Sequence, residues 1–496
     1  MKFLPLSFPR IKRSIHLGGS LFICVSLISE GAYAQNAPMA ANNPEFIPHT
    51  LNEALSLAYL TNPQLREARA QLRAVDEQMS AAMGGWRPTI SGSGALTYYK
   101  GESRYEQQTT VNGQKVKFPN LQRYNSGGYN TSVTLNQPIY QGGKTVAGIH
   151  MAKNQIFAQR ARLIQIEQEV LYNAMDAYVR LVGNKQLLQV SINNERSLQQ
   201  QLDATNRRFR LGELSRTDVA QAQGALATAT AERQQIEGTI QSIQATYLQA
   251  VGVPAPPDLV PPQPLALPVK TEQEAVMEAV RNNPNVIAAL FNEAQQKDNI
   301  SVQIATIMPK LSAGLGYQRS RDQGQDHSLQ DNKYASLNLQ VPIYQGGSEY
   351  SAIRQARQTA IAARHEVDVQ RRLALQQASA SWQFYVALKE TLESHKIAVS
   401  SNLAALAGVE RQALVGTATT LSVLQQQATL LQAQRDLIQN VTSLVTASYD
   451  IARSMGRLTA VDLKLNVPLY DEKAYYRAVK NRLWGIGDYQ TNLPGR

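Results

Sequence analysis

Two hydrophobic periodicities alternate along this chain. Four stretches in which apolar and polar residues alternate predict β-strands with one apolar face, at 88–100, 124–139, 309–319 and 333–343. Two proline-free stretches in which apolar residues recur at steps of three and four predict long helical hairpins, at 144–252 and 348–459. Each strand has about ten residues, the length with which a tilted strand crosses a bilayer.

The helical stretches are too long for an ordinary globular domain. From Lys144 to Arg210 there are 67 residues, which extend ~100 Å at about 1.5 Å per residue. Gly212 and Gly416 interrupt the two stretches, and we expect each stretch to fold back there. The apolar seam of the first stretch consists of Leu163, Ile166, Val170, Ala174, Ala177, Leu181, Leu188, Ile192, Leu198, Leu202 and Phe209.

The chain is an internal duplication. An offset of 221 residues pairs Asn62-Pro63 with Asn283-Pro284, and after the strands the offset is 204. An Asn-Pro pair is typical of a helix that ends and starts again, because proline fits the first helical turn. The helix predicted at about 50–83 is therefore broken at this pair.

The hexapeptide PIYQGG occurs at 138–143 and again at 342–347, in both cases where a strand should become a helix. Proline cannot donate to a strand ladder, and paired glycines permit a change of direction. We therefore predict that Pro138 and Pro342 end their strands. The residues of this predicted strand–helix junction are Pro138, Tyr140, Gly142, Gly143, Pro342, Tyr344, Gly346 and Gly347.

The repeats define the domain organisation. The predicted segments are a signal peptide (1–34), repeat 1 (35–252), a proline-rich strap (253–268), repeat 2 (269–459) and a C-terminal tail (460–496). The strap has seven prolines in sixteen residues, which predicts a stiff, extended segment.

The N-terminus indicates export. Basic residues precede an apolar run too short to span a bilayer, and Ala32-Tyr33-Ala34 fits a cleavage site. The single cysteine, Cys24, lies within this signal, so we expect the mature chain to have no disulfide. Removing the signal changes the net charge from +11 to +8 (four basic residues and one acidic residue). These charges are dispersed, which argues against nucleic acid as a partner.

No motif for catalysis or for a cofactor stands out. The six histidines are scattered without metal-ligand spacing, and the chain has no P-loop, nucleophile elbow or HExxH sequence. We therefore expect no enzymatic activity, no metal and no cofactor.

The duplicated motifs together resemble the TolC family of trimeric outer-membrane efflux and secretion channels. The resemblance rests on the two PIYQGG junctions, the two Asn-Pro pairs, and the hairpin turns at 207–223 and 411–430. The tail sequence GRLTAVDLKLNVPLYD resembles the branch that serves type I secretion. The implied fold is a trimeric 12-stranded β-barrel, four strands per chain, that continues into a long periplasmic α-helical barrel.

Barrel closure also follows from strand number. Four strands per chain cannot close a barrel, and open edges cannot face lipid, so oligomerisation is required.

The residues predicted to face lipid are Ile90, Leu96, Val133, Leu135, Leu311, Leu337 and Leu339. Those predicted to face the lumen are Ser91, Ser132, Thr134, Asn136, Ser312, Ser336 and Asn338. An outer aromatic girdle is predicted from Tyr98, Tyr99, Tyr129, Tyr317 and Tyr334, with Trp86, Tyr140 and Tyr344 at the periplasmic side. Extracellular loops are predicted at about 101–123 and 320–332.

The resemblance also implies partners. They are two further copies of the chain, outer-membrane lipid, a periplasmic adaptor protein and, indirectly, an inner-membrane RND pump or ABC exporter. The implied adaptor-docking tip consists of Arg208, Leu211, Gly212, Ser215, Asp218, Val415, Gly416, Thr417 and Thr420, where Ser215 or Thr417 could cap the returning helix. The implied periplasmic gate consists of Asp218, Ser422 and Gln425, where relatives often have acidic rings, so weaker cation selectivity is expected.

A different class of protein explains part of the pattern. A periplasmic coiled-coil scaffold without a pore would account for the helical seams. It would not account for four alternating strands of membrane-spanning length.

Overall fold

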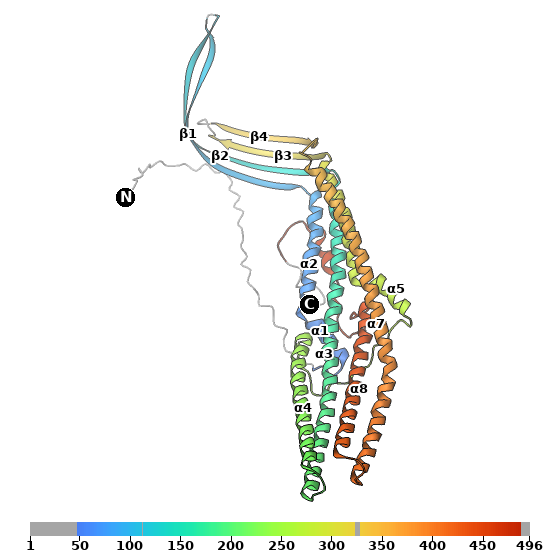
Figure 1. Ribbon diagram of the computed structural model, residues 1–496. Coiled ribbons are helices and arrows are strands. Elements are labelled where there is room, and N and C mark those ends of the chain that lie inside the picture. The colour runs from blue at the N-terminus through green and yellow to red at the C-terminus, as the bar shows by residue number, and fades with distance from the viewer. Residues whose placement is uncertain (1–46, 112, 323–327, 488–496) are drawn as a thin grey trace, which may run out of the picture. The chain divides into compact units, whose positions relative to one another are not determined.

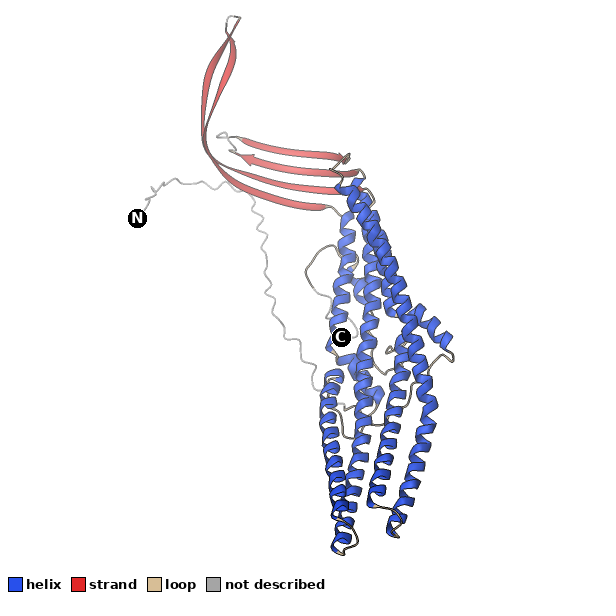
Figure 2. Ribbon diagram, in the orientation of Figure 1, coloured by secondary structure: helices blue, strands red, loops and turns tan. Residues whose placement is uncertain are grey.

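The computed structural model describes residues 47–111, 113–322 and 328–487. The predicted signal peptide and Cys24 lie outside these ranges. Figures 1 and 2 show the strands side by side and the long helices running along one another. None of the helices in the described ranges is both long and apolar enough to cross a membrane. In chain order, the elements are α1 (Leu51–Thr61), α2 (Pro63–Met83), β1 (Thr89–Val111), β2 (Gln114–Gln141), α3 (Lys144–Arg210), α4 (Arg216–Val251), α5 (Glu272–Asn282), α6 (Pro284–Ile304), β3 (Lys310–Arg321), β4 (Leu329–Gln340), α7 (Ser348–Leu414), α8 (Thr420–Ser454) and α9 (Ala474–Val479), with short 3-10 turns before β1 and β3.

Each repeat begins with a helix broken at its Asn-Pro pair. The side-chain oxygen of Asn62 accepts a hydrogen bond from the backbone N–H of Gln64 (2.9 Å), and Asn283 accepts one from Asn285 (2.9 Å). Because proline occupies the first helical position after each asparagine, the new helix starts there without losing a backbone bond.

The strands form one antiparallel sheet in the order β1-β2-β3-β4. β1 pairs with β2 along its entire length, and β3 pairs with both β2 and β4. Within the chain, β1 and β4 are therefore edge strands, each with one side left unpaired.

The strand limits differ from those predicted. Residues 101–123, which we expected to form a loop, continue the β1–β2 ladder as far as the pair Val111 and Gln114. A long polar segment satisfies its backbone groups by pairing with its antiparallel neighbour, so polarity alone did not end the strand. The second predicted loop, 320–332, is also shorter than expected: residues 320–321 belong to β3 and 329–332 to β4, while residues 323–327 are outside the described ranges. The offset between the repeats falls from 221 to 204 across the strands, so repeat 1 has 17 more residues there than repeat 2, and this longer β1–β2 hairpin contains them.

The two longest helices, α3 and α7, have 67 residues each. α4 packs along α3, and α8 along α7, so each repeat has its antiparallel helical hairpin. Most of the predicted seam of α3 is buried or partly buried, but Phe209 at its end is 41% exposed.

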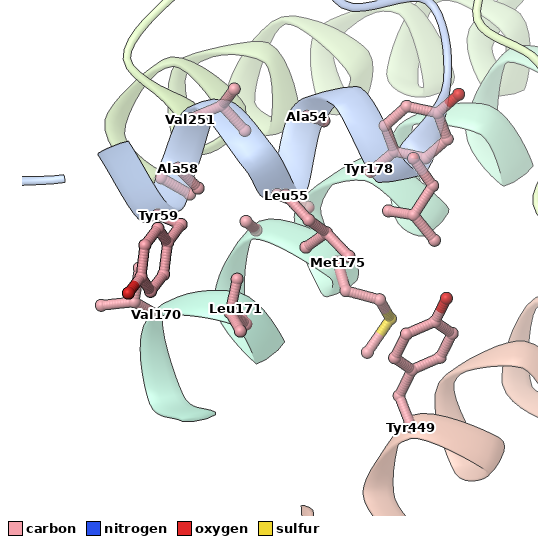
Figure 3. Packing of buried hydrophobic residues seen from close by; sticks show 14 of the residues in the cluster. Ala54, Leu55, Ala58, Tyr59, Val170, Leu171, Met175, Tyr178, Val251 and Tyr449 are labelled. Atoms are coloured by element: carbon pink, nitrogen blue, oxygen red, sulfur yellow. The ribbon is translucent and has the colours of Figure 1, made fainter. Parts of the chain in front are cut away.

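The main hydrophobic core lies where α1 crosses α3 and α4, with α8 alongside (Figure 3). Leu55 of α1 and Met175 of α3 are fully buried, and Tyr449 of α8 lies beside them. The Tyr178 hydroxyl lies 2.8 Å from the carbonyl oxygen of His49 and 2.7 Å from that of Val260. This core therefore joins both repeats and the strap.

The strap, 253–268, contains no helix or strand. Its first part contacts α3 and its later part contacts α8. The Lys185 ammonium group donates to the carbonyl oxygens of Pro256 and Pro257, at 2.9 Å each. Further along, the Leu265 N–H donates to the hydroxyl oxygen of Ser448 (2.9 Å). Proline carbonyls remain available as acceptors, so the strap is held through its backbone groups, by carbonyl oxygens at α3 and by the Leu265 N–H at α8.

The C-terminal tail packs on α2 through α9. The Tyr475 hydroxyl donates to the carboxylate of Glu77 (2.8 Å), and the Tyr470 N–H donates to the hydroxyl of Tyr59 (3.2 Å). Asp76, which precedes Glu77 on α2, is fully buried.

Candidate functional site

The sheet has one apolar and one polar face. The register aligns Ile90, Leu135 and Leu315 in one row, and all the residues predicted to face lipid share this apolar face. Most of its side chains are exposed in the single chain, Leu96 at 91%, while Leu135 and Leu311 are half-buried. On the polar face, the Ser91 hydroxyl lies 2.8 Å from that of Thr134. The register also places the residues predicted to face the lumen together on this polar face. A sheet with exposed apolar residues on one side and hydrogen-bonded hydroxyls on the other fits a wall between lipid and water.

The predicted aromatic girdle is only partly right. Tyr98, Tyr129 and Tyr317 share the apolar face, but Tyr99 and Tyr334 lie on the polar face. Successive residues of a strand point to opposite faces, so Tyr98 and Tyr99 cannot both face lipid.

The ring of Tyr334 covers a glycine on the neighbouring strand. Tyr334 pairs with Gly316, where an added Cβ would lie 2.2 Å from the tyrosine ring. An aromatic ring that covers a bare glycine shields its backbone from water.

The strand–helix junctions depend on glycines in the left-handed conformation. Gly142 and Gly143 have φ of +63° and +87°, and Gly346 and Gly347 have +74° and +80°. Gly143 precedes the first residue of α3, and Gly347 precedes that of α7. Residues with a Cβ rarely adopt these angles, so each copy of PIYQGG needs both glycines to turn a strand into a helix.

The two junctions differ in their surroundings. A Cβ at Gly142 would lie 2.4 Å from the Cβ of Met308, whereas nothing lies within 4 Å of one at Gly346. The central strand β2 continues through Pro138 to Gln141, with a bulge between Pro138 and Tyr140, so the prediction that Pro138 ends its strand is wrong. Pairing with β1 ends at Asn136, so β3 alone pairs with the segment around Pro138, and the bulge accommodates the proline.

The second copy behaves differently. β4 ends at Gln340, two residues before Pro342 and three before the predicted end. β4 ends where its partner strand begins, because Gln340 pairs with Lys310, the first residue of β3, and Pro342 has no residue of β3 opposite it. Tyr140 and Tyr344 are exposed, as is Trp86.

The two hairpin tips turn at Gly212 and Gly416, whose φ angles are +79° and +81°. Ser215 caps α4 through a capping box with Asp218: the Ser215 hydroxyl oxygen accepts from the Asp218 N–H (3.2 Å), and the Asp218 carboxylate accepts from the Ser215 N–H (2.9 Å). Hydrogen bonds from Ser215 lower the pKa of Asp218.

The α8 cap is not the residue we predicted. Thr419 caps α8, with its hydroxyl oxygen accepting from the Ser422 N–H (3.1 Å), while the Thr417 hydroxyl donates to the Gln412 carbonyl (3.1 Å). Adding the repeat offset of 204 to Ser215 gives Thr419, so the duplication itself could have identified this cap.

The tips expose most of the predicted docking residues. Leu211 and Val415 are each 75% exposed, whereas Thr420 is buried in the first turn of α8. Arg208 forms an ion pair with Glu213 (2.9 Å), which fixes the repeat-1 turn. Of the predicted gate residues, Asp218 and Ser422 occupy equivalent positions after the caps, and Gln425 is exposed on α8.

The asparagines of the Asn-Pro pairs have a second role that the sequence analysis missed. The Asn62 amide donates to the carbonyl oxygen of Ala250 at the end of α4 (3.1 Å), and the Asn283 amide donates to that of Ser454 at the end of α8 (3.1 Å). The two acceptors are 204 residues apart. Each asparagine therefore ties the start of its repeat to the end of the same repeat, which no local signal in the sequence indicates.

Comparisons with known proteins agree with this architecture. The sequence profile of the family described as "Outer membrane efflux protein" matches residues 54–253 and 275–457, one match in each repeat. The chain is 30% identical to outer membrane efflux protein BepC of Brucella suis biovar 1 (strain 1330), over 89% of this chain and 92% of BepC. It is 23% identical to outer membrane protein TolC of Salmonella enteritidis, over 84% of both.

A solved structure has the same fold. The outer-membrane channel OprN matches with a TM-score of 0.70 at 21% identity, over 82% of this chain and 89% of that chain. The resemblance predicted from the duplicated motifs is confirmed. The chain belongs to the outer membrane efflux protein family, whose TolC-like members are exit ducts of the Gram-negative outer membrane.

Proposed function

We propose that three copies of this chain close a 12-stranded barrel in the outer membrane. The observation that carries the proposal is a four-stranded sheet with an apolar face, a polar face and two unpaired edges, β1 and β4. Pairing β1 of one copy with β4 of the next satisfies both edges without exposing backbone groups to lipid. The family resemblance supports three copies rather than two.

The helices extend the duct into the periplasm. α3 and α7 follow directly from the strand–helix junctions, and 67 residues of helix reach ~100 Å. Six such helices from three copies would continue the wall of the barrel as an α-helical barrel, with α4 and α8 beside them.

The transported substrates leave passively through this duct. The chain serves as the exit of a tripartite efflux pump or of a type I secretion system, and conducts small molecules or unfolded proteins supplied by an inner-membrane RND pump or ABC exporter. The tail sequence supports the secretion branch. Deleting the gene and measuring both drug sensitivity and the secreted proteome would distinguish the two.

The hairpin tips dock a periplasmic adaptor protein. Support comes from the exposed apolar side chains of Leu211 and Val415, which flank Gly212 and Gly416 at the turns. A glycine lets another helical tip approach the backbone closely. Thr420 is buried and would act by shaping the turn.

Cross-linking tests this docking surface. The mature chain has no cysteine if the signal is cleaved, so Leu211→Cys and Val415→Cys would each introduce a single thiol. Both should cross-link to the adaptor in cells, whereas Leu375→Cys, an exposed position in the middle of α7, should not. Equal cross-linking at all three positions would contradict tip docking.

The narrow end of the duct selects weakly among ions. Asp218 supplies a carboxylate there, but it is engaged by Ser215, and its repeat-2 equivalent is Ser422. Reversal potentials in planar bilayers should show modest cation preference that falls further in Asp218→Asn. Strong preference that Asp218→Asn leaves unchanged would remove Asp218 from the gate.

The rival proposal, a periplasmic scaffold without a pore, predicts a different particle. The channel requires detergent for extraction, runs as a heat-modifiable trimer and conducts ions in planar bilayers. A monodisperse rod that is soluble without detergent and does not conduct would support the scaffold.

A further inference from the structure

The half of the sheet farther from the helices carries its basic side chains on one face only. In the register, the strand positions that share the apolar face with Ile90, Leu135 and Leu315 alternate strictly with those of the polar face. Eight basic residues occupy positions of the apolar face beyond its hydrophobic part, of which Lys115 and Lys117 lie farthest out, near the β1–β2 turn. We call the other six the basic rim: Lys100, Arg104, Arg123, Arg319, Arg321 and Lys333. The alternating positions of the polar face at the same level carry no charge in the described strands, and include Thr97, Tyr99, Ser103, Gln318, Ser320 and Asn332.

The basic rim follows the hydrophobic part in a fixed sequence. Along β1, the apolar face runs from Ile90 and Leu96 through Tyr98 to Lys100. Along β3 it runs through Tyr317 to Arg319. Each basic residue lies two positions beyond the tyrosine, which is ~7 Å at about 3.3 Å per residue. Apolar side chains, then tyrosines, then cations is the order of hydrocarbon, interface and headgroup across one leaflet.

The rim has an excess of positive charge that its own carboxylates do not neutralise. Glu102 pairs with Arg123 (2.9 Å), and Asp331 lies 3.7 Å from Arg319. Glu102 also lies 3.5 Å from Arg104, and Asp322, which directly follows β3, lies 3.4 Å from Arg321. Six basic and three acidic residues therefore leave an excess of three per chain. Lys100 and Lys333 are exposed, and no carboxylate in the described ranges lies within 4.0 Å of either ammonium group.

We propose that the basic rim binds the phosphate groups of an anionic membrane lipid in the leaflet farther from the helices. The proposal rests on the proposed function only in that the apolar face contacts lipid. A cation at the headgroup level gains from a phosphate partner and keeps its aliphatic stem along the apolar surface. Restriction of the cations to this face argues against a role in attracting substrates, which would pass along the polar face.

Lipid retention tests the proposal. The trimer in detergent is mixed with diphosphoryl lipid A or with its dephosphorylated form, and the lipids retained per chain are counted by native mass spectrometry. Wild-type protein should prefer the diphosphoryl form, and its affinity should fall with added salt. Each of Lys100→Gln and Lys333→Gln should weaken this binding about fivefold.

Two control variants distinguish an effect of where the lysine lies on the sheet from an effect of the total charge of the chain. Lys270→Gln with Lys389→Gln removes two charges, one more than either rim variant, from exposed positions outside the sheet and should leave binding unchanged. Exchanging neighbours, Lys333→Asn with Asn332→Lys, keeps the composition but moves the cation to the polar face, and should lose as much binding as Lys333→Gln.

The outcomes are distinguishable from those for the duct. Equal retention of both lipid forms, equal losses in the Lys270/Lys389 control, or full binding after the exchange would overturn the proposal. Displacement by inorganic phosphate more effective than by chloride at equal ionic strength would indicate a site for the free anion and overturn the lipid assignment. Planar-bilayer conductance of the same preparations tests the duct separately, because a conducting channel without phosphate preference refutes only this inference.

Discussion

The carboxyl group of Asp76 offers a quantitative test of how the C-terminal tail is packed. Asp76 is fully buried on α2, and neither of its oxygens has a hydrogen-bond partner among the described residues. Burial raises its pKa from an ordinary value of 3.8 to about 7, an effect that Arg160 opposes and that Glu472 and Glu77 increase. The carboxyl group is therefore more easily ionised in the unfolded chain than in the folded one.

The sign and size of the effect follow from these two values. Below pH 4 both states are protonated, and stability is unaffected. Between pH 4 and 7 the unfolded chain loses its proton first, so stability falls as the pH rises, and above pH 7 the loss is complete. A separation of about three pH units corresponds to ~4 kcal/mol, as an upper estimate, at about 1.4 kcal/mol per unit.

Asp76→Asn removes the ionisation while keeping the shape of the side chain. We expect the variant to unfold like the wild type at pH 4 and to be more stable at pH 8, by up to ~4 kcal/mol. Urea denaturation followed by circular dichroism in one detergent measures this difference. Glu67→Gln removes an exposed carboxylate on the same helix and is the matched control: it keeps Asp76 and should lose stability between pH 4 and pH 8 as the wild type does.

Two results would refute the reasoning. A stability difference that is the same at pH 4 and pH 8 would mean that the carboxyl group does not titrate in this range. A variant less stable than wild type at pH 8 would mean that Asp76 is ionised in the folded chain and held by Arg160, which a buried ion pair would explain.

The remaining predictions concern the duplicated features. Asn62→Ala and Asn283→Ala should each destabilise the chain by ~2–4 kcal/mol in the same assay, since each loses a helix cap (about 1 kcal/mol) and leaves a buried carbonyl unsatisfied (about 1–3 kcal/mol). Clearly unequal losses would argue that the two repeats do not use the asparagine in the same way. Gly142→Val should reduce the yield of heat-modifiable trimer more than Gly346→Val, because both residues have positive φ but only Gly142 has Met308 in the way. Unchanged assembly in the double variant would show that the left-handed glycines are not required for the junction.

The sequence by itself determined the features that depend on near neighbours. The breaks at Asn62 and Asn283, the left-handed turns at Gly212 and Gly416, and the two-faced strands all follow from residues within about one helical turn or two strand positions. Strand parity, applied strictly, would also have placed Tyr99 on the polar face. The duplication reinforced these local signals, because each occurs twice.

Only the tertiary structure decided the features that depend on distant segments. Residues 101–123 form a ladder because two polar segments pair with each other, and polarity alone could not distinguish this from a loop. The amide of Asn62 reaches Ala250, and the tail beyond residue 460 covers Asp76. Hydrogen-bond partners and burial are set by which surfaces meet after the chain folds, and a local pattern contains no information about a neighbour hundreds of residues away.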